Sequence, residues 1–241
     1  MATPYRARRF LLSLFTALAV IGFAAISQLQ GADEPPAKTI DAPQVAGSVA
    51  PAVGTAADAL GSLPVKGRAP KTGYTRSQFG SGWKSVQGCD MRNRILQRDL
   101  TDITFVQNNS CLVASGTLHD PYTGNTITFQ RGNTTSSLVQ IDHVVALSNA
   151  WQTGAQQLDA ALREQLANDP LELIAVDGSA NQQKGDGDAA TWLPANKPFR
   201  CQYAARQIAV KQKYSLWVTA AEKSAMERIL STCPGQVLPT P

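Results

Sequence analysis

The sequence has few histidines, no closely spaced cysteines and little net charge. Two of its 241 residues are histidine, so His119 and His143 are the imidazoles available for proton transfer near neutral pH. Four cysteines are present without a C-x-x-C pair, which argues against a structural zinc site. The formal net charge is +4, and three of the positive charges lie within residues 1–32, which contain no acid. Total charge therefore gives no argument for a nucleic-acid partner, and such an argument needs a local patch.

Residues 1–32 are typical of an export signal. Arginines at positions 6, 8 and 9 precede an apolar run over residues 10–26, the pattern of a signal peptide or of an N-terminal membrane anchor. We therefore expect the protein to be secreted, or to be anchored by an N-terminal membrane contact and to face the extracellular side.

The rest of the chain divides into three expected parts. Residues 33–72 are rich in Ala, Pro and Gly and contain no aromatic residue, which predicts a disordered linker. A frayed helix around residues 56–60 is the alternative for its second half. The folded domain is expected over residues 73–235, and a short tail over residues 236–241.

The four cysteines become informative if the protein is exported, because disulfides persist in oxidising compartments. Three pairings are possible. The pairing that is local in sequence, Cys89–Cys111 with Cys201–Cys233, is the simplest and is the one we expect. Each bond would close a loop of about 20–35 residues, worth roughly 3–4 kcal/mol in the chain-entropy model.

Hydrophobic patterns predict an alternation of helices and strands. Leucines at positions 158, 162 and 166 predict a helix with one buried stripe. Thr219 and Glu222 form a capping box that opens a last helix. The remaining expected elements are helices over 90–100 and 201–214, a short helix or turn over 181–188, and strands over 101–105, 111–118, 126–130 and 171–176.

An acid and an imidazole stand side by side in the apolar stretch from Gln140 to Leu147. Apolar and polar residues alternate here, which predicts a partly buried strand. Burial of Asp142 beside His143 is unfavourable unless a metal ion, a substrate or a structural hydrogen bond compensates. The plainer interpretation is that Asp142 caps a turn and His143 is a satisfied core side chain.

Further stretches extend this pattern in a fixed order. They are residues 89–94, 120–124, 141–147, 167–170, 175–186 and 192–194. Together they resemble the HNH (ββα-metal) nucleases, and more closely the exported branch related to the C-terminal nuclease domain of GmrSD-type restriction enzymes. The resemblance covers most of residues 74–233. It implies an α+β fold with a ββα-metal (HNH) nuclease core, a flanking hairpin, flanking helices and disulfide staples.

The resemblance also implies roles for single residues. It places the general base at His143, the metal-binding carboxylate at Asp142, and a second ligand, borne by a helix, at Asn181. Lys184 matches a lysine on the family's helix, which implies a catalytic contact with phosphate. The middle Asn of the family pattern has no match, because Glu172 stands in its place. We expect Glu172 to steady the loop between the strands structurally.

The implied activity is that of an exported metal-dependent endonuclease. Phosphodiester hydrolysis needs a water, a base that deprotonates it and a cation for the leaving oxygen. A neutral imidazole with a pKa of about 6.5 suits the base. Oxygen ligands from Asp142 and Asn181 suit Mg²⁺, or else Mn²⁺ or Ca²⁺. Nucleic acid is the implied substrate, with DNA favoured over RNA, and no protein partner is implied.

Arg92 and Arg94 belong to the densest basic cluster of the chain after the leader. We expect them to hold the nucleic-acid backbone, and a solvated helical face is the alternative. Two further functions compete with the nuclease. One is a tethered nucleic-acid or cell-envelope binding protein that has lost activity. The other is a glycosidase, which would need a carboxylate pair such as Glu172 with Asp186 and no metal.

Overall fold

The computed structural model describes residues 54–239. The expected leader over 1–32 lies outside the described residues, as does the first part of the expected linker. Within the described part, helices and strands both contribute, so the α+β prediction is confirmed. No helix in residues 54–239 combines the length and apolar character needed to cross a membrane.

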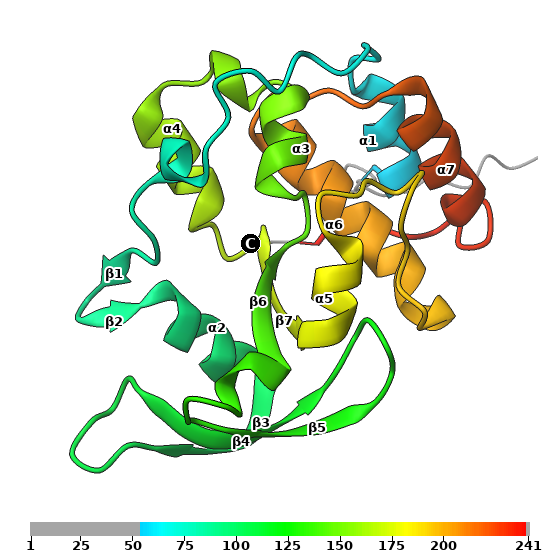
Figure 1. Ribbon diagram of the computed structural model, residues 1–241. Helices are drawn as coiled ribbons and strands as arrows, with labels where there is room; N and C mark the ends of the chain where they lie inside the picture. The colour runs from blue at the N-terminus through cyan, green and yellow to red at the C-terminus, as the bar shows by residue number, and fades with distance from the viewer. Residues whose placement is uncertain (1–53, 240–241) are drawn as a thin grey trace, which may run out of the picture. The chain divides into compact units, whose positions relative to one another are not determined.

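Two antiparallel strands and one helix form the centre of the described domain. Strand β6 (Val139–His143) pairs with β7 (Leu173–Asp177), and α5 (Gly178–Lys184) follows β7 directly and contacts both strands (Figure 1). Gly178 permits this close packing, because a Cβ there would lie 2.2 Å from the carbonyl oxygen of Ser137. The strand–strand–helix order predicted from the sequence is therefore present.

A three-stranded antiparallel sheet and one helix cover one side of this centre. The sheet has the order β3–β4–β5, from β3 (Leu100–Phe105), β4 (Val113–His119) and β5 (Thr126–Gln130). Helix α2 (Met91–Asp99) lies beside β7 and the sheet, and its Ile95 and Leu96 are buried in a shared core. Asp90 caps α2 by accepting from the Asn93 backbone N–H at 2.9 Å.

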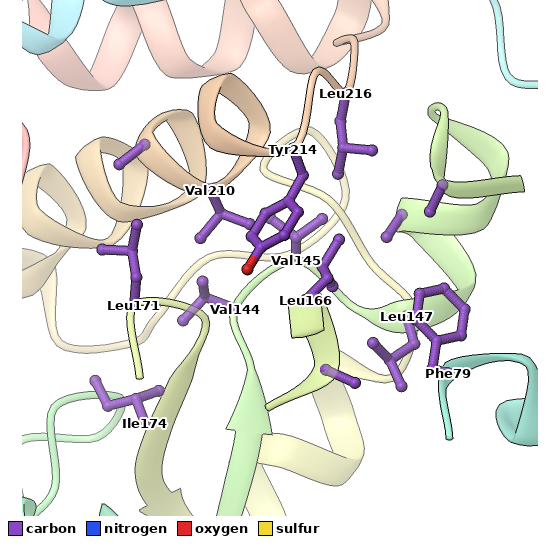
Figure 2. Close-up of a cluster of buried hydrophobic side chains, with 14 of the residues drawn as sticks. Phe79, Val144, Val145, Leu147, Leu166, Leu171, Ile174, Val210, Tyr214 and Leu216 are labelled. Carbon is purple, nitrogen blue, oxygen red and sulfur yellow. The ribbon is translucent and has the colours of Figure 1, made fainter. Parts of the chain in front are cut away.

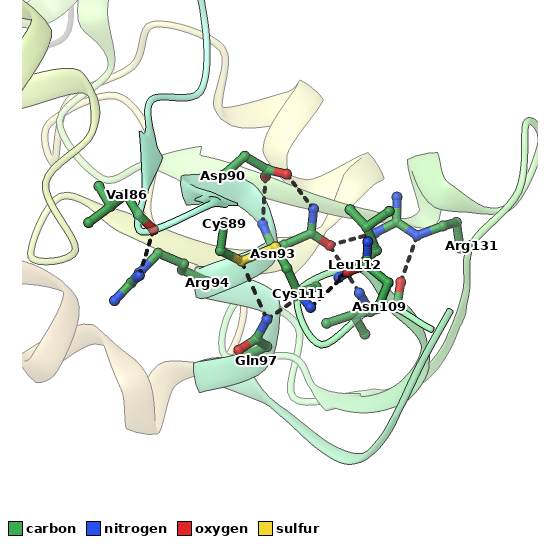
Figure 3. The surroundings of a disulfide bond; sticks show 11 residues. Val86, Cys89, Asp90, Asn93, Arg94, Gln97, Asn109, Cys111, Leu112 and Arg131 are labelled. Atoms are coloured by element: carbon green, nitrogen blue, oxygen red, sulfur yellow. Dashed lines mark hydrogen bonds between the residues drawn. A yellow bond between two sulfur atoms is a disulfide. The ribbon is translucent and has the colours of Figure 1, made fainter. Parts of the chain in front are cut away.

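The first disulfide ties this sheet to the beginning of α2. Cys89 lies in the short strand β2 (Cys89–Asp90), which pairs with β1 (Ser85–Val86), and it is bonded to Cys111 just before β4 (Figure 3). Gln97 of α2 donates to the Cys111 carbonyl oxygen at 2.7 Å. The expected pairing Cys89–Cys111 is therefore confirmed.

The other side of the centre is helical. The helices are α3 (Leu147–Gln152), α4 (Ala160–Ala167), α6 (Arg200–Lys213) and α7 (Ala220–Leu230), with short 3-10 helices at Arg76–Phe79, Ser136–Leu138, Ala155–Gln157 and Lys197–Phe199. Val144 and Val145, immediately after β6, pack among Val210 and Tyr214 of the α6 region, as Figure 2 shows. The residues that follow Asp142–His143 are thereby fixed in a core.

The predicted leucine stripe over positions 158, 162 and 166 is wrong. Asp159 caps α4 by accepting from the Leu162 backbone N–H at 2.8 Å, so the helix begins after Leu158. Leu166 is fully buried, whereas Leu162 is 40% exposed. A helix of eight residues buries only its last turn here.

The disordered-linker prediction is wrong for residues 54–72. Helix α1 (Ala56–Ser62) begins with a capping box between Thr55 and Asp58, and its Leu60 is buried against α6 and α7. Thr55 also bridges to Val237, so residues 236–239 are not a free tail. The alternative helix at residues 56–60 is confirmed. A second disulfide, Cys201–Cys233, joins α6 to the segment after α7, as predicted.

Candidate active site

A cavity of ≈ 520 Å³ lies at the end of β6, and we call it the cleft. Its floor comes from β6 and α5, and its wall comes from residues 71–83, far earlier in the chain. Asp142, His143 and Asn181 all line it, so the structure brings the three main predicted residues together. Neighbouring strand residues point to opposite faces, but β6 ends at His143. Both members of the Asp-His pair therefore reach the same cavity.

His143 is held as a neutral base. Its Nε2 lies 3.0 Å from the Ala167 carbonyl oxygen, and a carbonyl can only accept, so Nε2 carries the proton. Nδ1 has no hydrogen-bond partner among the described residues and is left as the acceptor. Burial lowers the pKa of His143 to about 3. The ring stacks parallel to Trp83, with centroids 5.8 Å apart. The imidazole is therefore oriented, uncharged and able to take a proton.

Asp142 is buried and carries two protein partners. Lys184 donates to its Oδ1 at 2.9 Å, and the Tyr122 hydroxyl donates to its Oδ2. Lys184 also donates to the His143 carbonyl oxygen at 2.8 Å, and its side chain is fully buried. This arrangement replaces the phosphate contact predicted for Lys184 with an ion pair. Lys184 thus donates to both residues of the Asp-His pair. Because its side chain is fully buried, it cannot contact a phosphate in the cleft.

Asn181 faces the cleft from α5. Its side-chain nitrogen donates to the Gln140 Oε1 at 2.9 Å. That bond fixes the orientation of the amide and leaves the Asn181 Oδ1 without a hydrogen-bond partner among residues 54–239. The short helix thus presents one oriented oxygen to the cleft that Asp142 also lines.

Glu172 steadies the loop that leaves β6. Its Oε2 accepts from the Val145 backbone N–H at 3.2 Å, and its own carbonyl oxygen accepts from the Val144 N–H at 2.9 Å. The side chain is completely buried and does not line the cleft. Glu172 is therefore bonded to the backbone of this loop at two points. Because it cannot reach the cavity, the pairing of Glu172 with Asp186 in a glycosidase is excluded.

The Glu172 carboxyl group is expected to be protonated and uncharged in the folded protein, and this affects how stability depends on pH. Burial raises the pKa of Glu172 well above its ordinary value of 4.5, so at neutral pH the unfolded state has released a proton that the folded state keeps. Stability should therefore fall as pH rises above 4.5, by at most about 1.4 kcal/mol per pH unit. Glu172→Gln lacks this titration. We expect it to match the parent near the ordinary Glu pKa and to become the more stable protein as pH rises, in urea unfolding at several pH values.

The matched comparison for this experiment is Glu172→Ala. Alanine leaves the Val145 N–H without an acceptor, which costs about 1–3 kcal/mol. A glutamine variant that is as unstable as the alanine variant at every pH would show that Glu172 is ionised in the fold.

Comparisons with known proteins decide the family. A sequence model described as GmrSD restriction endonucleases, C-terminal domain, matches residues 90–229. The chain belongs to this family. It is also 40% identical over 186 residues to a protein of Arthroderma benhamiae described as an uncharacterized secreted protein, covering 76% of this chain and 87% of that one. No solved structure matches the chain.

The region matched by the family model contains part of the cleft but not all of it. Asp142, His143 and Asn181 fall within residues 90–229. The wall of the cleft, by contrast, includes Lys71, Tyr74, Arg76 and Trp83, all of which precede the matched region. The resemblance of motifs could not point to these residues. An Arg followed by aromatic residues ahead of the first disulfide was a signal for Arg76 and Trp83.

Arg92 and Arg94 do not act together. Arg92 lines the cleft and donates to the carbonyl oxygens of Ser136 and Val139 at 3.2 and 3.1 Å. Arg94 is two residues away, on another face of α2, and donates to the Val86 carbonyl oxygen. Arg98, one turn after Arg94, contacts the Leu173 carbonyl oxygen. The helical spacing separates Arg92 from Arg94 and Arg98, and of these three arginines Arg92 lines the cleft.

The oxygen atoms of the cleft that could ligate a metal fit a divalent ion bound by few protein ligands. Asp142 keeps lone pairs beyond those used by Lys184 and Tyr122, since a carboxylate accepts about four hydrogen bonds. The Asn181 Oδ1 adds a second hard oxygen. Residues 54–239 contain no cluster of three or more His, Cys, Asp or Glu residues able to hold a metal. Mg²⁺ sites commonly use one or two protein oxygens and complete the shell with water and substrate phosphate.

Proposed function

We propose that the protein is an exported, metal-dependent endonuclease of the HNH type that hydrolyses phosphodiester bonds, with DNA favoured over RNA. One observation carries the proposal. His143 is neutral, holds its proton on Nε2 through Ala167, and faces a cleft with Nδ1 free, beside Asp142 and Asn181. A general base must be uncharged and oriented toward the water it deprotonates. Membership of a restriction endonuclease family supports the same chemistry.

The residues that line the cleft, and those that contact Asp142, have different roles in the proposed hydrolysis. His143 accepts the proton of the attacking water at Nδ1. Asp142 and Asn181 are the residues that would hold a divalent ion, which supplies charge stabilisation for the leaving oxygen. Tyr122 and Lys184 fix the position of the Asp142 carboxylate by hydrogen bonds to its two oxygens. Arg92, at the edge of the cleft, attracts the phosphate backbone.

Export agrees with three features of the chain. The leader over residues 1–32 has the composition of a signal, both disulfides have formed, and the fungal relative is described as secreted. Disulfides of this kind persist outside the reducing cytosol. We therefore place the proposed activity outside the cell.

A binding protein without activity is the second candidate, and one contact favours it. The Lys184 ammonium group lies 2.9 Å from the Asp142 Oδ1 and offsets the negative charge that would attract a divalent ion. The two functions differ in metal dependence. Binding needs no divalent ion, whereas hydrolysis should stop when the ion is removed.

The test is cleavage of single-stranded DNA and of plasmid by the oxidised protein across a titration of Mg²⁺ or Mn²⁺, with a chelator control. The parent should cut with added ion and stop in excess chelator. Asn181→Ala should raise the ion concentration for half-maximal activity by at least about 10-fold, because one of two oxygens is lost. Asn133→Ala, an exposed change outside the cleft, is the control. Equal cleavage in excess chelator, or none with any ion, contradicts the proposal.

A further inference from the structure

A second cavity of ≈ 330 Å³ adjoins the cleft at His143, and we call it the side pocket. Arg76, Trp83, His143 and Leu147 line both cavities. The side pocket therefore continues the cleft beyond the imidazole. Its volume is at the lower end of the range of small-molecule sites.

The lining of the side pocket is aromatic, apolar and free of acid. Phe79, Trp83, Leu147 and Ala167 contribute its apolar surface, and the loop of residues 80–82 contributes small side chains. No Asp or Glu lines it, and Arg76 is its cation. A planar, uncharged group of modest size suits such a lining, because it can contact aromatic surface on entering.

Arg76 stands at the junction of the two cavities. It is exposed, and among residues 54–239 it makes no ion pair and no side-chain hydrogen bond. Arg92, which also lines the cleft, differs because its guanidinium group donates to two carbonyl oxygens. An unengaged guanidinium group suits a phosphate, which it can contact through two parallel hydrogen bonds.

We propose that the side pocket binds the unstacked base of a nucleotide next to the scissile phosphate, so that single-stranded nucleic acid is the substrate. The proposal rests on the proposed nuclease function. A base in a duplex is stacked on both faces and must leave the stack to enter a pocket. A single strand offers its bases without that loss. Arg76 then holds the phosphate that joins the base in the side pocket to the nucleotide in the cleft.

The test measures equilibrium binding in excess chelator, where no strand is cut. The probes are a short labelled oligothymidylate, an abasic strand of the same length and a duplex of the same length, followed by fluorescence anisotropy. The parent should bind the base-bearing strand more tightly than the abasic strand and the duplex. Trp83→Leu keeps an apolar side chain but removes the stacking surface. It should weaken binding of the base-bearing strand on the order of 5- to 150-fold and leave the abasic strand unchanged.

Two further variants test the same pocket by other means. Ser81→Leu fills the side pocket from an exposed position whose side chain makes no hydrogen bond, and it should reproduce the Trp83→Leu pattern without risk to the core. Arg76→Gln should weaken both the base-bearing and the abasic strand. Phe105→Leu removes an exposed aromatic residue on β3, outside both cavities, and should change nothing.

The proposal is overturned if Trp83→Leu and Ser81→Leu, both folded by circular dichroism, bind the oligothymidylate as tightly as the parent. It is also overturned if the parent binds the duplex as tightly as the single strand. Failure of the nuclease function is read separately, from cleavage with added ion. If the protein binds single strands through Trp83 but does not cleave them with any ion, the side-pocket proposal stands and the nuclease proposal fails.

Discussion

His143→Ala is expected to lose strand cleavage while keeping nucleic-acid binding. The variant removes Nδ1, the free acceptor that faces the cleft, and leaves the two oxygen donors of Asp142 and Asn181 in place. Loss of a general base typically lowers the rate about 10²–10⁴-fold. The measurement is single-turnover cleavage of single-stranded DNA at saturating ion, with anisotropy in chelator as the measure of binding.

The second histidine is the matched control for this experiment. His119 lies at the end of β4, is exposed, and contacts Thr126 at the surface. His119→Ala should cleave at the rate of the parent. The parent should also remain active as pH falls through 6.5, because burial has lowered the pKa of His143 to about 3 and the base stays uncharged. Cleavage by His143→Ala at the parental rate would remove His143 from the mechanism.

Lys184→Met is expected to lower the free energy of unfolding by about 3–5 kcal/mol, since it leaves the buried Asp142 carboxylate without its counter-charge. Urea unfolding of the oxidised protein measures the loss. Adding Asp142→Asn should recover part of it, because the uncompensated charge is then removed. This ion pair joins the fully buried Lys184 side chain to the Asp142 Oδ1 at 2.9 Å.

An exposed pair at the same cleft provides the control. Lys71 and Asp186 lie 3.1 Å apart, and both side chains are 54% exposed. Exposed pairs contribute about 0–1 kcal/mol, so Lys71→Met should unfold nearly like the parent. If Lys184→Met is also nearly neutral, the ammonium group does not lie against Asp142 in the folded protein.

Local patterns predicted the parts of the fold that local physics determines. The β6 strand follows from alternation, the α7 helix from its capping box, and the two disulfides from the sequence-local pairing rule. The residues that the motif order singled out, Asp142, His143 and Asn181, line one cavity, and their roles there remain a prediction. In each case the decisive residues lie within a short stretch or follow a known spacing.

Contacts between distant segments were beyond that reasoning. Helix α1 has few large residues, and its stability comes from burial of Leu60 against α6 and α7, more than a hundred residues later. Likewise, no feature of the sequence shows that the Lys184 ammonium group pairs with Asp142 instead of contacting a phosphate. The position of Arg76 depends on how the segment before α2 packs near the end of β6. Periodicity in the sequence does not predict that packing.

Much of the cleft comes from two stretches of chain that lie far apart in the sequence. Asp142, His143 and Asn181 belong to the strand–strand–helix unit, whereas the opposing wall is one short run, residues 71–83. That run is attached to the helical side by the Trp151 bond to the Thr72 carbonyl oxygen and by the Arg163 bond to the Gln78 carbonyl oxygen. In the proposed nuclease, exchange of this run between relatives should alter which strands enter the cleft, provided that the Trp83 ring stacked on His143 is kept. Selectivity would then reside in a segment separate from the strand–strand–helix unit.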